Sequence, residues 1–127
     1  MNSEIVVSTP GKIVISGEYA VLDGASSIVS TLNQRANISI HKSDKNYNIF
    51  STSALESIFP FTIDEDSNIV WFDADPGVFG LLLEHAFNIL KPQLKEKFCI
   101  SVDSSEFFRT TKDGAAIKLG IGSSAAV

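Results

Sequence analysis

The chain has 127 residues, of which 44% are hydrophobic and 20% charged, and its formal net charge at pH 7 is −5. This composition is typical of one globular domain with a single core. The acidic balance argues against binding nucleic acid or an anionic membrane, because those partners are held by clustered Lys and Arg. No apolar run has the length of a membrane span and the chain start lacks a secretory signal, so we expect a cytoplasmic protein with neither partner.

The first part of the chain is predicted to form short strands. Pro10-Gly11 and Asp23-Gly24 are turn signals, and Lys42–Asn46 is a polar interval between apolar runs. We expect the two strands that flank this interval to form an antiparallel hairpin. The expected strands are Glu4–Thr9, Ile13–Ser16, Ile28–Leu32, Ala36–His41 and Tyr47–Ser51.

The middle of the chain is predicted to contain little regular structure. Ser53–Asn68 is expected to be mostly loop, with a short strand near Ile58–Ile63. The acidic group Asp64-Glu65-Asp66 in this segment fits a solvated turn better than a metal loop, because further carboxylates at the required spacing are missing.

One helix is predicted over Gly77–Lys91. Asp75 suits its N-cap and Pro76 its first position, and apolar residues recur at three- and four-residue steps. Phe98–Asp103 is expected to be a strand, and Ser104–Leu119 a long connection with a turn at Lys112-Asp113-Gly114. These elements predict an α+β fold, a mostly antiparallel sheet with a helix on one face. The expected core includes Val14, Ile28, Ile40, Leu81, Phe87 and Ile100.

A glycine- and serine-rich segment at the end of the chain predicts an anion site. Gly120 and Gly122 allow a close approach of the backbone, and the following residues favour a helix whose first N–H groups bind phosphate. Ser123 and Ser124 add hydroxyls for phosphate oxygens or Mg²⁺. An ordinary helix N-cap at either serine is the alternative interpretation. A P-loop is excluded because the Gly-Lys-Ser/Thr run is missing, and the dinucleotide fingerprint matched by Gly120, Gly122 and Ala125 lies far from a first strand.

Two segments of the chain resemble motifs of the GHMP kinases. Lys118–Val127 closely resembles the second motif of that family, which wraps the ATP phosphates. Thr9–Gly24 resembles the first motif of mevalonate and phosphomevalonate kinases, and Tyr19 after Glu18 looks more like the phosphomevalonate kinases. The chain is therefore identified as the amino-terminal part of a GHMP kinase, over residues 1–127 and ending inside the second motif.

This resemblance implies a fold and a set of roles. The fold would be that of the second domain of ribosomal protein S5. Lys12 would be the catalytic lysine, and Glu18 and Tyr19 would shape the acceptor site. Residues Gly120, Gly122, Ser123, Ser124 and Ala125 would bind the phosphates of ATP, with Ser123 or Ser124 reaching Mg²⁺. The catalytic aspartate of the family lies beyond its second motif and has no counterpart here.

The resemblance predicts an ATP-dependent kinase acting on mevalonate or phosphomevalonate in isoprenoid-precursor synthesis, inactive as this fragment. A noncatalytic binding module with the same fold is the alternative, and a nicotinamide oxidoreductase is a weaker third. We also expect a homo-oligomer, most simply a two-fold dimer, formed through the truncated face.

Overall fold

The computed structural model describes residues 4–122. Its contacts divide the chain into two compact units. One holds residues 38–102 with the start of the chain and is called the helix unit below. The other holds residues 7–37 and the chain from residue 103 onward. It contains both kinase-like segments and is called the motif unit.

The described elements form an α+β arrangement, as predicted. The larger sheet has the strand order β1-β2-β6-β3-β4-β5, and β7 and β8 form a separate two-stranded sheet. Strand β3 is antiparallel to β4 and parallel to β6, and β4 is antiparallel to β5. The elements are β1 (Ile5–Ser16), η1 (Ala20–Asp23), β2 (Ile28–Lys42), β3 (Asn48–Thr52), β4 (Leu55–Ile63), β5 (Ile69–Trp71), α1 (Val78–Leu90), β6 (Phe98–Asp103), η2 (Ser105–Phe107), β7 (Phe108–Thr110) and β8 (Ala116–Lys118), where η denotes a 3₁₀ helix.

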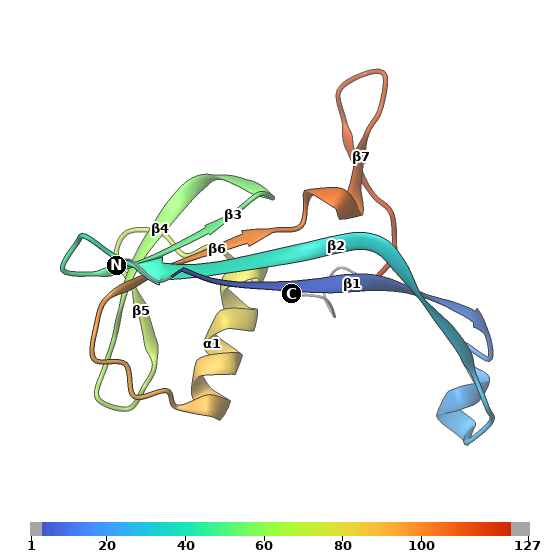
Figure 1. Ribbon diagram of the computed structural model, residues 1–127, viewed down its shortest axis with the longest axis horizontal. Coiled ribbons are helices and arrows are strands. Elements are labelled where there is room, and N and C mark those ends of the chain that lie inside the picture. The colour runs from blue at the N-terminus through green and yellow to red at the C-terminus, as the bar shows by residue number, and fades with distance from the viewer. Residues whose placement is uncertain (1–3, 123–127) are drawn as a thin grey trace. The chain divides into compact units, whose positions relative to one another are not determined.

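The core of the helix unit lies between its strands and α1, which covers one face of them (Figure 1). Alternate residues of the central strands are buried, because successive side chains of a strand point to opposite faces. The helix contributes Phe79, Leu83 and Phe87, four residues apart, so they share one side of it. The buried cluster comprises Phe50, Phe59, Phe61, Phe87, Phe98, Ile100 and Val102.

Three of the six residues predicted for the core lie in it or pack against it, and the other three are exposed. Phe87 and Ile100 are buried, and Ile40 packs against the cluster. Leu81 is exposed because it lies two residues from both Phe79 and Leu83, about 200° around the helix from each. The expectation also fails for two strand residues, since Val14 and Ile28 are 37% and 59% exposed.

The helix begins later than its capping signals predict. Gly77 is the N-cap, with φ 59°, and its N–H donates to Asp75 Oδ1 at 2.6 Å. Pro76 is therefore outside the helix, where its buried ring packs on Gly80: a Cβ at Gly80 would be 2.7 Å from Pro76 Cγ. Asp75 closes the turn before the helix instead of capping the helix.

Two predicted strand pairs are each a single strand, and one predicted hairpin is wrong. Strand β1 continues through Pro10-Gly11, and β2 joins the runs 28–32 and 36–41. Strand β6 lies between β2 and β3 in the sheet, so those two strands are not hairpin partners. The parallel pairing of β3 with β6, which aligns Phe50 with Ile100, joins residues far apart in sequence and replaces the local pairing.

The loops of the helix unit follow their sequence signals in part. Asp64 is in the predicted acidic turn, where its carboxylate accepts hydrogen bonds from Asn68 Nδ2 and from the backbone N–H groups of Asp66 and Asn68. The hydrogen bond from the Asn68 side chain holds the pKa of Asp64 below its ordinary value. Strand β4 is longer than expected and runs through Pro60.

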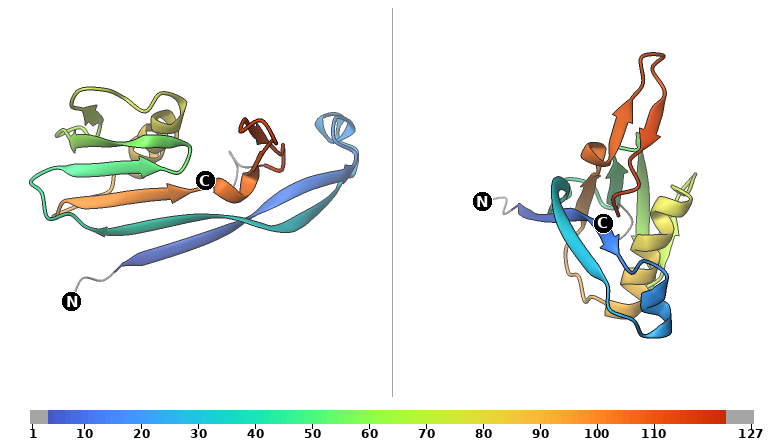
Figure 2. Two further views of the ribbon diagram at one scale, coloured as in Figure 1. Left: turned by 90° about the horizontal axis from the view of Figure 1, so that it is seen from above. Right: turned by 90° about the vertical axis from the view of Figure 1, so that its right-hand side faces the viewer.

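The segment predicted as a long connection contains more structure than expected. Residues 104–119 form η2 and then the β7–β8 hairpin, a separate ribbon in the two views of Figure 2. The turn of this hairpin is at the predicted Lys112-Asp113-Gly114, with Gly114 at φ 82°. Among residues 4–122, no helix is long and apolar enough to cross a membrane.

Candidate functional site

The two kinase-like segments meet in the motif unit through a backbone hydrogen bond. The Lys12 N–H, on β1, donates to the Ile121 carbonyl oxygen at 2.9 Å. Ile121 follows Gly120 in the second segment, after β8 has ended. A contact across about 110 residues of sequence therefore sets the predicted catalytic lysine beside the predicted phosphate loop.

Gly122 packs directly on the side chain of Lys12. A Cβ built on Gly122 would be 3.0 Å from Lys12 Cγ and 3.7 Å from Lys12 Cε. Gly122 has φ 80° and Gly120 has φ 69°, conformations that L side chains rarely adopt. The loop thus needs glycine at residue 122 for two independent reasons, its backbone angle and the space that Lys12 occupies.

The side chain of Lys12 is exposed, and its ammonium has no hydrogen-bond or ion-pair partner among residues 4–122. A lysine held by its backbone and by the packing of its methylenes keeps its charge available to an anion. This arrangement fits the lysine role that the first motif implies.

Gly11 does not form the turn that the sequence predicts, because a buried aromatic ring packs against it. A Cβ on Gly11 would be 2.8 Å from Phe107 Cε1 and 2.9 Å from the Ile121 carbonyl oxygen. Gly11 is buried and has no positive φ. Gly11 is a strand residue at which another part of the chain comes close to the backbone, and glycine within a strand often marks such a contact.

Phe107 contacts both kinase-like segments and was not predicted from the sequence as a residue of the site. It is fully buried, and Ala36, Phe108 and Ile121 pack around it. Its carbonyl oxygen accepts a hydrogen bond from the Leu119 N–H at 2.9 Å. The glycine at residue 11 is the sequence signal from which a close packing partner could have been inferred.

Strand β2 anchors η2, the short helix that carries Phe107. The Arg35 N–H donates to Glu106 Oε2 at 2.7 Å. The Arg35 guanidinium reaches β1, where it donates to Ser8 Oγ at 2.7 Å and to the Ser8 carbonyl oxygen at 2.9 Å. These hydrogen bonds connect β1, β2 and η2.

No hydrogen bond among residues 4–122 joins the other predicted site residues to the side chain of Lys12. Glu18 and Tyr19 precede η1, both are exposed, and neither side chain forms a hydrogen bond within residues 4–122. Ser123, Ser124 and Ala125 lie outside the described residues, and with them the predicted Mg²⁺ ligand. No group of three or more His, Cys, Asp or Glu side chains in the described chain could hold a metal ion.

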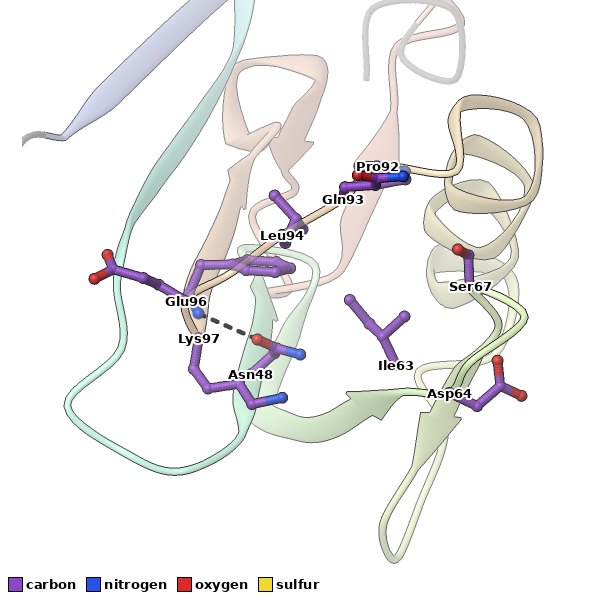
Figure 3. Close-up of a pocket in the computed structure, with 10 residues that line it drawn as sticks. Asn48, Ile63, Asp64, Ser67, Pro92, Gln93, Leu94, Glu96 and Lys97 are labelled. Carbon is purple, nitrogen blue, oxygen red and sulfur yellow. Dashed lines mark hydrogen bonds between the residues drawn. The ribbon is translucent and has the colours of Figure 1, made fainter.

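A separate hollow of about 230 Å³ lies in the helix unit (Figure 3). Asn48 lines it, almost fully buried, and its Oδ1 accepts the Phe98 N–H at 3.1 Å. Asn48 Nδ2 has no partner among the described residues. None of the residues predicted for catalysis or phosphate binding lines this hollow, so the candidate site remains the one around Lys12.

Comparison with known proteins agrees with the motif resemblance. No family model matches the chain. The mevalonate kinase of Archaeoglobus fulgidus is 44% identical over 41 residues, which are 32% of this chain and 14% of that kinase. The structure of the Methanococcus jannaschii mevalonate kinase is similar to this chain, with a TM-score of 0.69 and 24% sequence identity. The match covers 98% of this chain and 37% of that kinase chain.

A third similar protein is the Streptococcus pneumoniae phosphomevalonate kinase, solved in complex with phosphomevalonate and AMPPNP. The match covers 96% of this chain and 33% of that kinase chain, with a TM-score of 0.60 and 20% sequence identity. The chain thus spans about a third of the length of these two structures. It has the fold of part of the mevalonate and phosphomevalonate kinases, the fold that its two GHMP-like segments predict.

Proposed function

We propose that this chain carries part of the acceptor and ATP sites of an ATP-dependent kinase that phosphorylates mevalonate or phosphomevalonate in isoprenoid-precursor synthesis. The observation that carries the proposal is the hydrogen bond from Lys12 to Ile121, which joins the two kinase-like segments. A phosphomevalonate kinase of the same fold is solved with phosphomevalonate and AMPPNP. The proposal includes a cytoplasmic protein and an amino-terminal domain, residues 1–127, that resembles the second domain of ribosomal protein S5.

The proposed roles follow from what phosphoryl transfer requires. Negative charge on the transferring group must be neutralised and the reactants held in line, with little covalent participation by the protein. Lys12 would supply a fixed positive charge, and the backbone of Gly120 and Gly122 would approach the phosphates. Ser123, Ser124 and Ala125 would continue the phosphate loop, and Glu18 and Tyr19 would contact the acceptor. Mg²⁺, held in part by Ser123 or Ser124, would neutralise the charge of the ATP phosphates.

The experiment is an ATP-consumption assay with mevalonate and with phosphomevalonate, on the natural full-length protein and on this chain alone. We expect turnover by the full-length protein with one of the two acceptors and none by the chain alone. Turnover by the isolated chain would contradict the second expectation. A full-length protein that binds ATP but transfers phosphate to neither acceptor would contradict the first and support the noncatalytic binding module.

We also propose that the isolated chain self-associates, most simply as a two-fold dimer. Strand β1 is last in the strand order of the larger sheet, and its Val7 and Ile15 are 53% and 62% exposed. Exposed apolar side chains on an edge strand recruit further chains. Sedimentation is expected to show a dimer, and Ile15→Lys is expected to shift it to monomer, while Lys45→Ala, at an exposed loop residue, leaves it unchanged. A monodisperse monomer of the unmodified chain at high concentration would overturn this proposal.

A further inference from the structure

The ring of Phe107 touches the first kinase-like segment, while its backbone and its neighbours touch the second. Cε1 and Cζ would be 2.8 Å and 3.4 Å from a Cβ on Gly11, the residue before Lys12. The Phe107 carbonyl oxygen holds Leu119, and Ile121 packs against the same buried cluster. Ile121 in turn accepts the Lys12 N–H. Phe107 is therefore a shared support under both sides of the site.

We propose that Phe107 is a positioning residue for phosphoryl transfer, and that its ring sets the separation between Lys12 and the Gly120–Gly122 loop. The inference rests on the proposed function and extends it to a residue that touches neither substrate nor phosphate. A buried, close-packed ring transmits a change in its size to its neighbours, because interiors have few voids to absorb it. Misplacing a reacting group by about 1 Å can cost roughly 100-fold in rate.

Phe107 is held firmly enough to serve as such a support. Its N–H donates to the Ser104 carbonyl oxygen at 3.0 Å, and its neighbour Glu106 accepts the Arg35 N–H. Arg35 also binds Ser8, on the strand that leads to Lys12. The ring is thus fixed relative to both β1 and β2.

The test compares Phe107→Leu with Phe87→Leu. Leucine keeps the apolar character of Phe107 but lacks the ring atoms Cε1 and Cζ that meet Gly11. Phe87 is also a buried phenylalanine, but it packs in the helix unit against Phe98. Both variants lose similar packing, so a purely structural role predicts the same result for both. Phe107→Met, whose flexible side chain refills most of the volume, replaces the leucine variant if that variant does not fold.

Two readouts are taken under conditions where both variants are folded. In the full-length kinase, Phe107→Leu is expected to lower kcat roughly 100-fold with little change in KM for ATP, and Phe87→Leu to keep kcat. In this chain alone, hydrogen exchange of the Lys12 amide is expected to speed up at least about tenfold relative to the Val21 amide in Phe107→Leu only. The Val21 N–H, which donates to the Gly17 carbonyl oxygen, is the internal reference.

The two readouts separate this inference from the proposed function. Unchanged Lys12 exchange in Phe107→Leu, an equal change in Phe87→Leu, or an unchanged kcat in Phe107→Leu would each overturn the role of Phe107. A full-length protein without kinase activity would instead refute the proposed function, and the exchange measurement would still decide whether Phe107 supports the contact between Lys12 and Ile121.

Discussion

Replacing Lys12 with alanine is expected to lower kcat of the proposed full-length kinase by roughly 100- to 1,000-fold, the usual effect of removing one group that stabilises charge in a transition state. The Lys12 backbone N–H remains in the variant, so its bond to Ile121 is retained. Because the side chain is exposed, the free energy of unfolding should change by no more than about 0.5 kcal/mol. Steady-state kinetics and chemical denaturation measure the two effects.

Lys112→Ala is the matched control for this prediction. Lys112 is an exposed lysine of the same motif unit, in the turn between β7 and β8. It changes the net charge equally but lies in another loop, so kcat should be unaffected. Lys12→Arg is expected to recover little activity, because a planar guanidinium does not replace a compact ammonium. Equal activities of Lys12→Ala and the unmodified enzyme would show that Lys12 has no catalytic role.

Gly122→Ala is expected to cost at least about 100-fold in kcat, because the new methyl group would displace the side chain that is proposed to bind the phosphoryl group. A Cβ at residue 122 would lie 3.0 Å from Lys12 Cγ, which is tighter than most real Cβ contacts, so the lysine side chain would have to move. The variant also carries the strain of a left-handed backbone, roughly 1–2 kcal/mol for an L residue. Kinetics and denaturation together separate the displacement from the strain.

Two other glycines are compared. Gly24→Ala, in the turn after η1, is the control, because it introduces the same kind of strain at φ 84° but a Cβ there meets nothing within 4 Å. Gly120→Ala, at φ 69°, also meets nothing within 4 Å, and it measures the effect of strain at a second glycine that is proposed to approach the phosphates. If Gly122→Ala loses no more activity than Gly24→Ala, the contact with Lys12 is not what matters. Loss of activity in Gly24→Ala would indicate that strain alone inactivates the enzyme.

The charge of Lys12 comes from one residue of a sequence motif, whereas the space beside it is formed by several segments of the chain. The lysine is visible in the sequence as part of a motif. The space depends on Gly122, on the extended conformation of Gly11 and on the ring of Phe107, which come from three separate segments. Such a site is expected to tolerate changes in exposed charge elsewhere and to respond strongly to one added methyl group at residue 122.

The elements predicted correctly are those whose signals are local. Phe98–Asp103 is a strand with the predicted bounds, because its alternation of buried and half-buried residues is written in consecutive residues. The turn at Asp23-Gly24 is also correct, since Gly24 supplies the left-handed conformation that ends η1. The helix was located correctly, but its first residue depends on the packing of Pro76 against Gly80 and was wrong.

The sequence by itself determined the class of fold, the presence and place of the helix, and the two segments that carry the candidate chemistry. Only the tertiary structure decided that Pro10-Gly11 continues a strand, that β6 separates β2 from β3, and that Phe107 supports the site. The physical reason is the same in all three cases. Local propensity and periodicity are properties of neighbouring residues, whereas a glycine read as a turn becomes a close contact only when a ring about 100 residues away packs against it.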